Sequence, residues 1–271
     1  MRMLMCTDGS RCAAEALRLG TLIAREAGDQ VTLLGVIENP KEERKVVRML
    51  DRTSNALCDD VPHIETLVRR GHAAEEILEE TEQNDYDLVV VGSRGRRGVT
   101  RFLLGSTAAR LARYCPVPVL LVKGRRRRLR KILVCTGGAE AGEKDTRIAG
   151  SIAALVGASV TVLHVMSQLA LGPAVDVSDL DSSSRAILQS ECREGVHLRK
   201  DLQILEDLSV SGEAKVRHGL VIDEILAEAR EGDYDLIVTG AHVARGIQRF
   251  MLTDTTEQIV LASDRSVLVV R

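Results

Sequence analysis

Three glycines and two hydroxyl residues form the stretch of this chain whose types and spacing are best suited to chemistry. Gly92 and Gly95 are followed, after nine residues, by Gly105, and Ser106 and Thr107 come directly after it. Glycine lets main-chain N–H groups approach an anion closely, and the first turn of a helix supplies N–H donors without partners inside the helix. The two hydroxyl groups add further donors. The spacing therefore predicts a phosphate-binding loop.

The elements around this stretch can hold such a loop at the end of a strand. Residues 87–91 form an apolar run that is long enough for a buried strand and too short for a helix. From about Leu103 to Tyr114, apolar residues recur at helical spacing, which predicts a helix that begins near Leu103. The loop would then connect a strand end to a helix start.

Each glycine taken singly is also an ordinary turn signal after a strand. The three together, with Ser106 and Thr107 beside the last, favour the phosphate loop. The spacing differs from the Walker loop because no Gly-Lys-Ser/Thr follows, and from the dinucleotide fingerprint because that motif places its glycines closer together.

Short apolar runs alternate with amphipathic segments along the first half of the chain. We expect strands at 3–6, 31–37, 64–68, 87–91 and 117–122, and helices at 11–27, 41–57, 73–82 and 103–114. This alternation is typical of an α/β fold, in which a doubly wound parallel sheet carries helices on both faces. Asp8 follows the first strand, at the edge where open α/β sheets bind ligands, although a plain Asp-Gly turn explains it too.

The same pattern restarts after a basic run. Residues 131–138 resemble 2–9 at an offset of 129, whereas 233–236 match 85–88 at an offset of 148, so the second copy is 19 residues longer. The extra length falls between about Met166 and Ser211. We therefore expect two domains of one fold, at 1–123 and 132–271, joined by a basic linker at 124–131.

The spacing G-x2-G-x9-G-S/T after a strand resembles the nucleotide signature of ATP-binding universal stress proteins. Gly92, Gly95, Gly105 and Ser106 fill its four positions, and residues 115–122 resemble the last strand of that family. The resemblance covers nearly the whole chain, in the tandem UspA-like form of the family. It implies two Rossmann-like five-stranded sheets of strand order 3-2-1-4-5, with ATP bound by the first.

The resemblance also implies roles for residues outside the loop. Asp8 would contact the ribose, Cys6 and Thr7 would lie near the base, and the backbone of Val36 would read adenine. Arg94, inside the loop, either strengthens anion binding or belongs to a solvated basic loop. Mg²⁺ would be held by the phosphates and water rather than by a protein cage.

The second half departs from this motif. It keeps Gly240, but Val243 stands in place of Gly95, Thr253 and Asp254 replace Gly105 and Ser106, and Gly137 stands where Asp8 would be. A carboxylate at the phosphate position repels an anion, and a Cβ at Thr253 obstructs close backbone approach. We therefore expect one nucleotide site per chain.

Composition excludes several other classes of function. The formal net charge is −2, aromatic residues are 2% of the chain and Trp is absent, which disfavours nucleic-acid binding through stacked bases. The six cysteines contain no C-x-x-C pair and the six histidines are dispersed, so neither a metal site nor a catalytic triad is expected. We expect a cytoplasmic protein, because no signal peptide or membrane-spanning run is visible. Attraction to the acidic second half explains the basic linker.

The resemblance implies nucleotide sensing or storage in a stress response, and the sequence shows no catalytic base. Two alternatives stay open. The chain is a slow ATPase or an autokinase with Ser106 or Thr107 as phosphoacceptor, or it is a scaffold whose first half stays empty.

The final strands of the two halves, at 117–122 and 266–270, are both apolar. In the order 3-2-1-4-5 each would be an edge strand, and natural proteins rarely leave such an edge exposed. We expect them to pair antiparallel within the chain, which leaves association of two whole chains as a further possibility.

Overall fold

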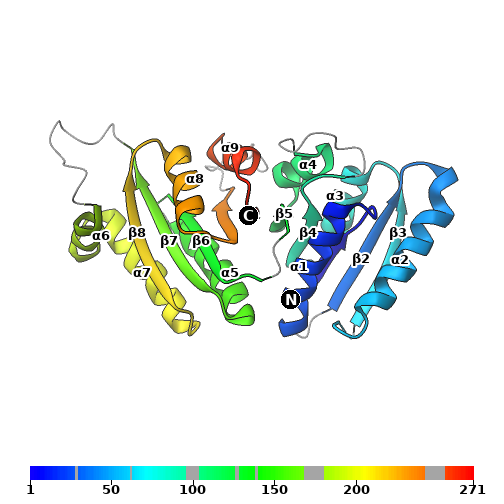
Figure 1. Cartoon of the computed structure of the whole chain (residues 1–271), viewed down its shortest axis with the longest axis horizontal. Helices are drawn as coiled ribbons and strands as arrows, with labels where there is room; N and C mark the ends of the chain where they lie inside the picture. The colour runs from blue at the N-terminus through cyan, green and yellow to red at the C-terminus, as the bar shows by residue number, and fades with distance from the viewer. Residues whose placement is uncertain are drawn as a thin grey trace.

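Two similar α/β halves lie side by side in the computed structural model, with α2 and β3 at one end and α6, α7 and β8 at the other (Figure 1). The structure describes residues 1–27, 30–61, 63–95, 104–125, 128–137, 140–167, 180–241 and 254–271. Across these ranges, no helix is both long and apolar enough to cross a membrane.

Strands and helices alternate in the first half in the expected order. Its elements are β1 (Met3–Cys6), α1 (Arg11–Ala27), β2 (Gln30–Ile37), the 3₁₀ turn η1 (Pro40–Glu42), α2 (Glu43–Leu57), β3 (His63–Arg70), α3 (Ala73–Gln83), β4 (Leu88–Gly92), α4 (Ser106–Tyr114) and β5 (Val119–Val122). Every predicted element of this half is present, and the bounds differ by a few residues.

The second half repeats the order with one additional helix. Its elements are β6 (Lys131–Thr136), α5 (Glu140–Val156), β7 (Ser159–Met166), α6 (Leu180–Gln189), α7 (Arg193–Asp207), β8 (Gly212–His218), α8 (Val221–Glu231), β9 (Leu236–Gly240), α9 (Asp254–Ala262) and β10 (Ser266–Val270). The extra residues of this copy contain α6. The start of the insertion, from residue 168 to 179, lies outside the described residues.

The ten strands form one sheet in the order β3-β2-β1-β4-β5-β10-β9-β6-β7-β8. Each half therefore has the predicted order 3-2-1-4-5, and all pairings within a half are parallel. The two halves join where β5 and β10 run antiparallel, with Leu120 opposite Leu268. The predicted pairing of the final strands is confirmed, and it fuses two five-stranded sheets into one.

Alternating side chains of the strands divide the core into two layers. On β1, Met3 and Met5 face one layer while Leu4 and Cys6 face the other, as the two-residue period of a strand requires. Helices α1, α2, α5 and α7 cover the first layer, and α3, α4, α8 and α9 cover the second. Each layer runs through both halves, so the halves share their hydrophobic core.

A reciprocal pair of cations closes the joint between the halves. Lys123, after β5, donates from its amine to the backbone carbonyls of Val260 and Ser263 at the end of α9, at 2.8 Å for Ser263. Arg271, after β10, donates to the carbonyls of Ala112 and Cys115 at the end of α4. All three positions of one contact are displaced by 148 residues from those of the other, so the contact is pseudo-twofold. Cations at helix C-termini also complement the helix dipole.

A buried carboxylate network is repeated in the two halves. Glu80 accepts hydrogen bonds from Tyr86 at 2.8 Å and from Arg69 at 2.9 Å. Glu228 accepts in the same way from Tyr234 at 3.0 Å and from Arg217 at 2.8 Å. Because a buried charge is costly without partners, both halves retain the whole set.

Three of the predicted boundaries that differ from the structure are informative. Helix α4 begins at Ser106 rather than near Leu103, because Gly105 is extended with φ −67° and ψ 148°. Strand β5 begins at Val119 because Pro118 has no N–H for the ladder, while its carbonyl accepts from Val89 at 2.9 Å. Lys131, assigned to the linker, is already the first residue of β6.

Candidate anion-binding site at the carboxyl edge of the sheet

The predicted site residues gather where the strand order reverses. β1 and β4 are parallel neighbours in the sheet, and the chain leaves them in opposite directions, toward β2 and toward β5. Their carboxyl ends therefore lie side by side: Asp8 comes shortly after the end of β1, and Gly92 is the last residue of β4. Open α/β sheets bind ligands at such a position.

The turn after β1 fixes the Asp8 carboxylate. Gly9 has φ +74°, a left-handed conformation that favours glycine. Oδ1 of Asp8 accepts from the Ser10 N–H at 2.9 Å, and Ser10 Oγ accepts from the Ala13 N–H at 3.1 Å, so Ser10 caps the start of α1. The other carboxylate oxygen lies toward the glycine loop, since a Cβ added at Gly95 would be 3.0 Å from Asp8 Oδ2.

The three loop glycines are required for different reasons. A Cβ at Gly92 would lie 2.7 Å from the carbonyl carbon of Cys12, so this glycine lets β4 pack against the backbone of α1. Gly95 leaves room beside Asp8. A Cβ at Gly105 would lie 3.3 Å from the Cα of Arg94, so Gly105 lets the two ends of the loop come together.

A backbone hydrogen bond closes this loop. The Gly105 N–H donates to the Ser93 carbonyl at 2.8 Å, and the Ser93 N–H donates to the Val122 carbonyl at 2.9 Å. The N–H of Gly105 is thus occupied, so the N–H donors for an anion must come from the first turn of α4, which begins at the next residue. Residues 96–103, in the middle of the loop, lie outside the described residues.

The start of α4 supplies such donors. Gly105 is the N-cap and provides no capping side chain, so the first-turn N–H groups, beginning at the exposed Ser106 and half-buried Thr107, carry the partial positive charge of the helix. Arg94 is half-buried in the adjoining loop. Together these groups can hold an anion.

The predicted base side of the site is apolar and buried. Cys6 is 8% exposed, and burial raises the pKa of its thiol, so it is neutral at pH 7 and serves as a packing residue. The Thr7 N–H donates to the Leu34 carbonyl at 2.9 Å, past the end of β1. Backbone groups of a strand alternate in direction, so Val36, two residues after Leu34, directs its N–H and C=O toward the same side, where β1 has ended.

Sequence reasoning missed two residues near this edge. Met49, on α2, covers the turn after β1, since its Cγ would be 3.3 Å from a Cβ at Gly9. A methionine in an amphipathic helix gives no signal of this position. Lys123 is the second missed residue. Burial lowers the pKa of its amine to about 8, the charge of Asp264 opposes this shift, and the charge of Arg94 adds to it. The effect of Arg94 indicates that a second cation lies near the loop.

The same edge in the second half has different groups. β6 and β9 are parallel neighbours, as β1 and β4 are. Gly137 occupies the place of Asp8; it is exposed, and a Cβ added to it would have no heavy atom of the described residues within 4 Å. α9 begins at Asp254 as α4 begins at Ser106, 148 residues earlier. Val243 and Thr253 lie outside the described residues.

A doubly wound α/β repeat with a candidate anion-binding loop in its first half is thus the class of protein that the fold and the site define. Both halves match the family model described as the universal stress protein family, over residues 1–123 and 128–271. The chain therefore belongs to the universal stress protein family, as a tandem member.

Individual relatives agree with this assignment over most of the chain. A universal stress protein E homolog from Haemophilus influenzae is 24% identical over 229 residues, which cover 81% of this chain and 72% of that protein. The crystal structure of a universal stress protein from Archaeoglobus fulgidus matches at TM-score 0.66 and 18% identity, covering 100% of this chain and 98% of its own. A functionally unknown protein from Pseudomonas aeruginosa matches at TM-score 0.72 and 18% identity, covering 99% and 92%. At these identities the two structures support the fold.

Proposed function

We propose that the first half of this chain binds one molecule of ATP, and that the protein senses or stores this nucleotide in a stress response. The observation that carries the proposal is the convergence of Asp8, Gly95 and the uncapped start of α4 at the point where the strand order reverses. This arrangement offers a carboxylate and an anion cradle side by side, as a nucleotide requires.

The phosphates would lie over the start of α4. The N–H groups and hydroxyls of Ser106 and Thr107 would donate to phosphate oxygens, and Arg94 would add a guanidinium. The absence of a side chain at Gly105 keeps the Ser93–Gly95 backbone within contact distance of this helix start. Access of the anion to the helix N-terminus depends on that glycine.

The nucleoside would lie on the β1 and β2 side of the edge. Asp8 directs Oδ2 toward Gly95, on the loop side of the edge, where a carboxylate oxygen would accept a bond from a ribose hydroxyl. Beyond the end of β1, the backbone of Val36 can donate and accept, which suits the edge of adenine. Cys6 and Thr7, both buried, would form the apolar floor beneath the base.

Mg²⁺ would enter with the phosphates. Asp8 is the one carboxylate among the proposed nucleotide contacts, and within the described ranges no group of three His, Cys, Asp or Glu side chains could hold a metal ion. Mg²⁺ commonly keeps several waters and binds through substrate phosphates, which fits this arrangement. When bound, it would neutralise phosphate charge.

A cytoplasmic location is part of the proposal. All six cysteines are free, including the exposed Cys58 and Cys192, as is usual in a reducing compartment.

A phosphoacceptor role for Ser106 is the second candidate function, because its hydroxyl is exposed at the start of α4, where phosphates would lie. Single-turnover incubation of the full chain with ATP labelled at the γ-phosphate separates the two. Nucleotide storage predicts intact ATP after hours, an ATPase predicts free labelled phosphate, and an autokinase predicts label on the chain that a Ser106→Ala and Thr107→Val double variant loses.

Mass spectrometry of nucleotide extracted from the purified protein tests the proposal itself, followed by calorimetric titration of the stripped chain with ATP and Mg²⁺. A higher affinity for ATP than for GTP or ribose 5-phosphate supports the proposal. A stripped, folded chain that shows no heat with ATP at millimolar concentration contradicts it and favours the scaffold reading.

A further inference from the structure

The antiparallel joint brings the C-terminal end of α9 to the carboxyl edge of the first half. β5 ends at this edge, and β10 begins beside that end, because Leu121 pairs with Val267. The Lys123 N–H, just after β5, donates to Ser266 Oγ at 3.1 Å. α9 ends shortly before β10 begins. The partial negative charge of a helix C-terminus therefore lies at the edge where we propose that phosphates bind.

Lys123 lies between this helix end and the phosphate loop. The Ser93 N–H donates to the carbonyl of Val122, the residue before Lys123, so the loop and Lys123 leave the sheet side by side. Side chains of a strand alternate in direction, and Leu121 faces the core layer that α4 and α9 cover. Lys123, two residues later, therefore points to the side of the sheet on which α4 begins.

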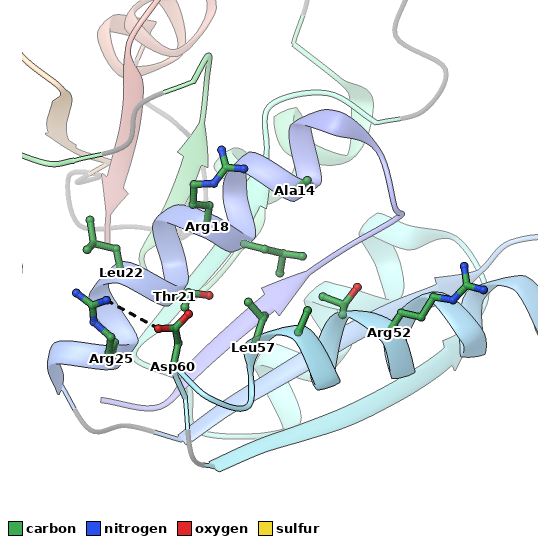
Figure 2. Close-up of a pocket in the computed structure, with 11 residues that line it drawn as sticks. Ala14, Arg18, Thr21, Leu22, Arg25, Arg52, Leu57 and Asp60 are labelled. Carbon is green, nitrogen blue, oxygen red and sulfur yellow. Dashed lines mark ion pairs between the residues drawn. The ribbon is translucent and has the colours of Figure 1, made fainter.

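Main-chain carbonyls hold the amine of Lys123. Other cations of the first half pair with carboxylates: across the gap between α1 and α2, for example, Arg25 lies 3.8 Å from Asp60 (Figure 2). Lys123 Nζ donates to the carbonyl of Ser263 at 2.8 Å and to that of Val260, at the end of α9. Because a helix end carries only about half a unit of charge, the full charge of Lys123 exceeds it and can also attract phosphates at the loop.

The charges that face Lys123 come from the loop and from the segment after α9. Burial is the main cause that lowers the pKa of its amine to about 8. Asp264, after α9, raises this pKa, and Arg94, in the loop, lowers it further. The two cations therefore lie close enough to repel each other, and an anion bound beside Arg94 would relieve that repulsion.

The reciprocal contact of the joint lies far from the phosphates. Arg271 donates to the carbonyls of Ala112 and Cys115 at the C-terminal end of α4. The nine residues of α4, at about 1.5 Å each, place this end roughly 13 Å from the helix start at Ser106. This separation exceeds the Debye length of about 8 Å at physiological salt, so only Lys123 is placed to act on a bound phosphate.

We propose that Lys123 is a specificity-determining residue of the nucleotide site and makes it favour ATP over AMP. Its charge screens the phosphates from the C-terminal end of α9 and attracts each added phosphate group. This inference rests on the proposed ATP site and adds the number of phosphates as the property to which the joint responds. Because the attraction grows with the charge of the ligand, loss of Lys123 should affect ATP more than AMP, whereas a purely structural role would affect both equally.

Calorimetric titration of the full chain with ATP and with AMP tests this inference through the ratio of the two affinities. We expect Lys123→Gln to lower the ratio about tenfold and Lys123→Arg to keep it. Arg271→Gln, which breaks the reciprocal contact, is the matched control and should leave the ratio unchanged. An unchanged ratio in Lys123→Gln, or an equal loss in Arg271→Gln, would overturn this inference while ATP binding stands. A parent chain that binds neither nucleotide would overturn the proposed function and this inference with it.

The pH dependence of the same ratio needs no destabilising variant. Both nucleotides are almost fully ionised above about pH 7.5, since the second pKa of a phosphate group is about 6. Raising the pH from 7.5 to 9.5 removes the proton of Lys123 and should lower the ratio in the parent several-fold. Lys123→Arg keeps its charge and every other titrating group, so its ratio should stay constant. Parallel pH profiles of the parent and Lys123→Arg would contradict the role of Lys123.

Discussion

The carboxyl edges of the two halves are formed by corresponding strands, and they differ in the residues that could contact a ligand. Both halves keep a buried Glu–Tyr–Arg network. Both also keep an Asp whose carboxylate accepts from a backbone N–H just before the first strand: Asp87 Oδ2 from Arg2 at 2.6 Å, and Asp235 Oδ2 from Arg130 at 2.8 Å. Asp8 of the first half, in contrast, is matched by Gly137. Because the second half forms the same fold without it, Asp8 is not needed for folding.

The glycines divide in the same way. Gly92 has a counterpart in Gly240, and it is the glycine whose Cβ would collide with the backbone of α1. Gly95 and Gly105 are matched by Val243 and Thr253. Gly92 therefore serves a packing contact for which both halves keep a glycine, whereas Gly95 and Gly105 are specific to the first half, as the proposal of a single nucleotide site requires. Resemblance to a motif alone does not separate these two causes.

Breaking the joint between the halves should have the largest effect. Leu120 and Leu268 are fully buried and face each other across β5 and β10, so replacing both with Lys buries two unpaired charges, each at a cost of roughly 3–5 kcal/mol. We expect chain aggregation or loss of the cooperative unfolding transition in calorimetry. Leu261→Lys, at a position 48% exposed on α9, is the control and should unfold like the parent. A double variant with parental stability would show that the shared sheet is not what holds the halves together.

Gly105→Val should abolish nucleotide binding while the chain stays folded. The backbone of Gly105 is in an extended conformation that any residue adopts, but its Cβ would press on Arg94 and on the Ser93 carbonyl at 3.4 Å. We expect ATP affinity to fall at least about 100-fold, the equivalent of ~2.7 kcal/mol, so that titration detects no bound ATP. Gly137→Val, at the matching edge of the second half, is the control, since its Cβ would have no heavy atom of the described residues within 4 Å. Equal ATP affinity of the Gly105 variant and the parent in calorimetry would refute the site assignment.

Asp8→Ala should weaken ATP binding by roughly 1–3 kcal/mol, the value of a hydrogen bond to a charged group. The loss should be smaller for 2′,3′-dideoxy-ATP, which lacks the ribose hydroxyls. Gly137→Ala should change neither affinity nor stoichiometry. If the variant loses the same free energy with ATP and with the dideoxy nucleotide, Asp8 does not contact the ribose.

The two cations at the joint should differ in their response to pH. Burial lowers the pKa of Lys123 from 10.5 to about 8, whereas Arg271 stays charged. Between pH 8 and 10.5 the unfolded chain binds more protons at this lysine than the folded chain does, so the free energy of unfolding rises with pH across that window. We expect a gain of roughly 2 kcal/mol in urea denaturation, allowing for the partial exposure of Lys123. Lys123→Arg should remove it, and a variant with the parental pH profile would exclude Lys123 as its source.

The two-domain repeat could be predicted because buried strands have a simple apolar pattern and their offsets match. The strand order 3-2-1-4-5 was implied by the family resemblance, and it made each final strand an edge strand, from which the β5/β10 pairing could be predicted. The start of α4 could not, because Leu103 and Leu104 continue the apolar pattern, and the extended conformation of Gly105 depends on its tertiary bond to Ser93. The reciprocal contacts of Lys123 and Arg271 were equally hidden, since they join residues 137 to 159 positions apart.

Calorimetric titration of the nucleotide-free chain with ATP and Mg²⁺ tests the central claim most directly, when it is carried out on the parent, on Gly105→Val and on Gly137→Val. The difference between the two edges predicts one ATP per chain in the parent, none in Gly105→Val and one in Gly137→Val. Two equivalents in the parent, or one retained in Gly105→Val, would show that the second half binds nucleotide or that the site lies elsewhere.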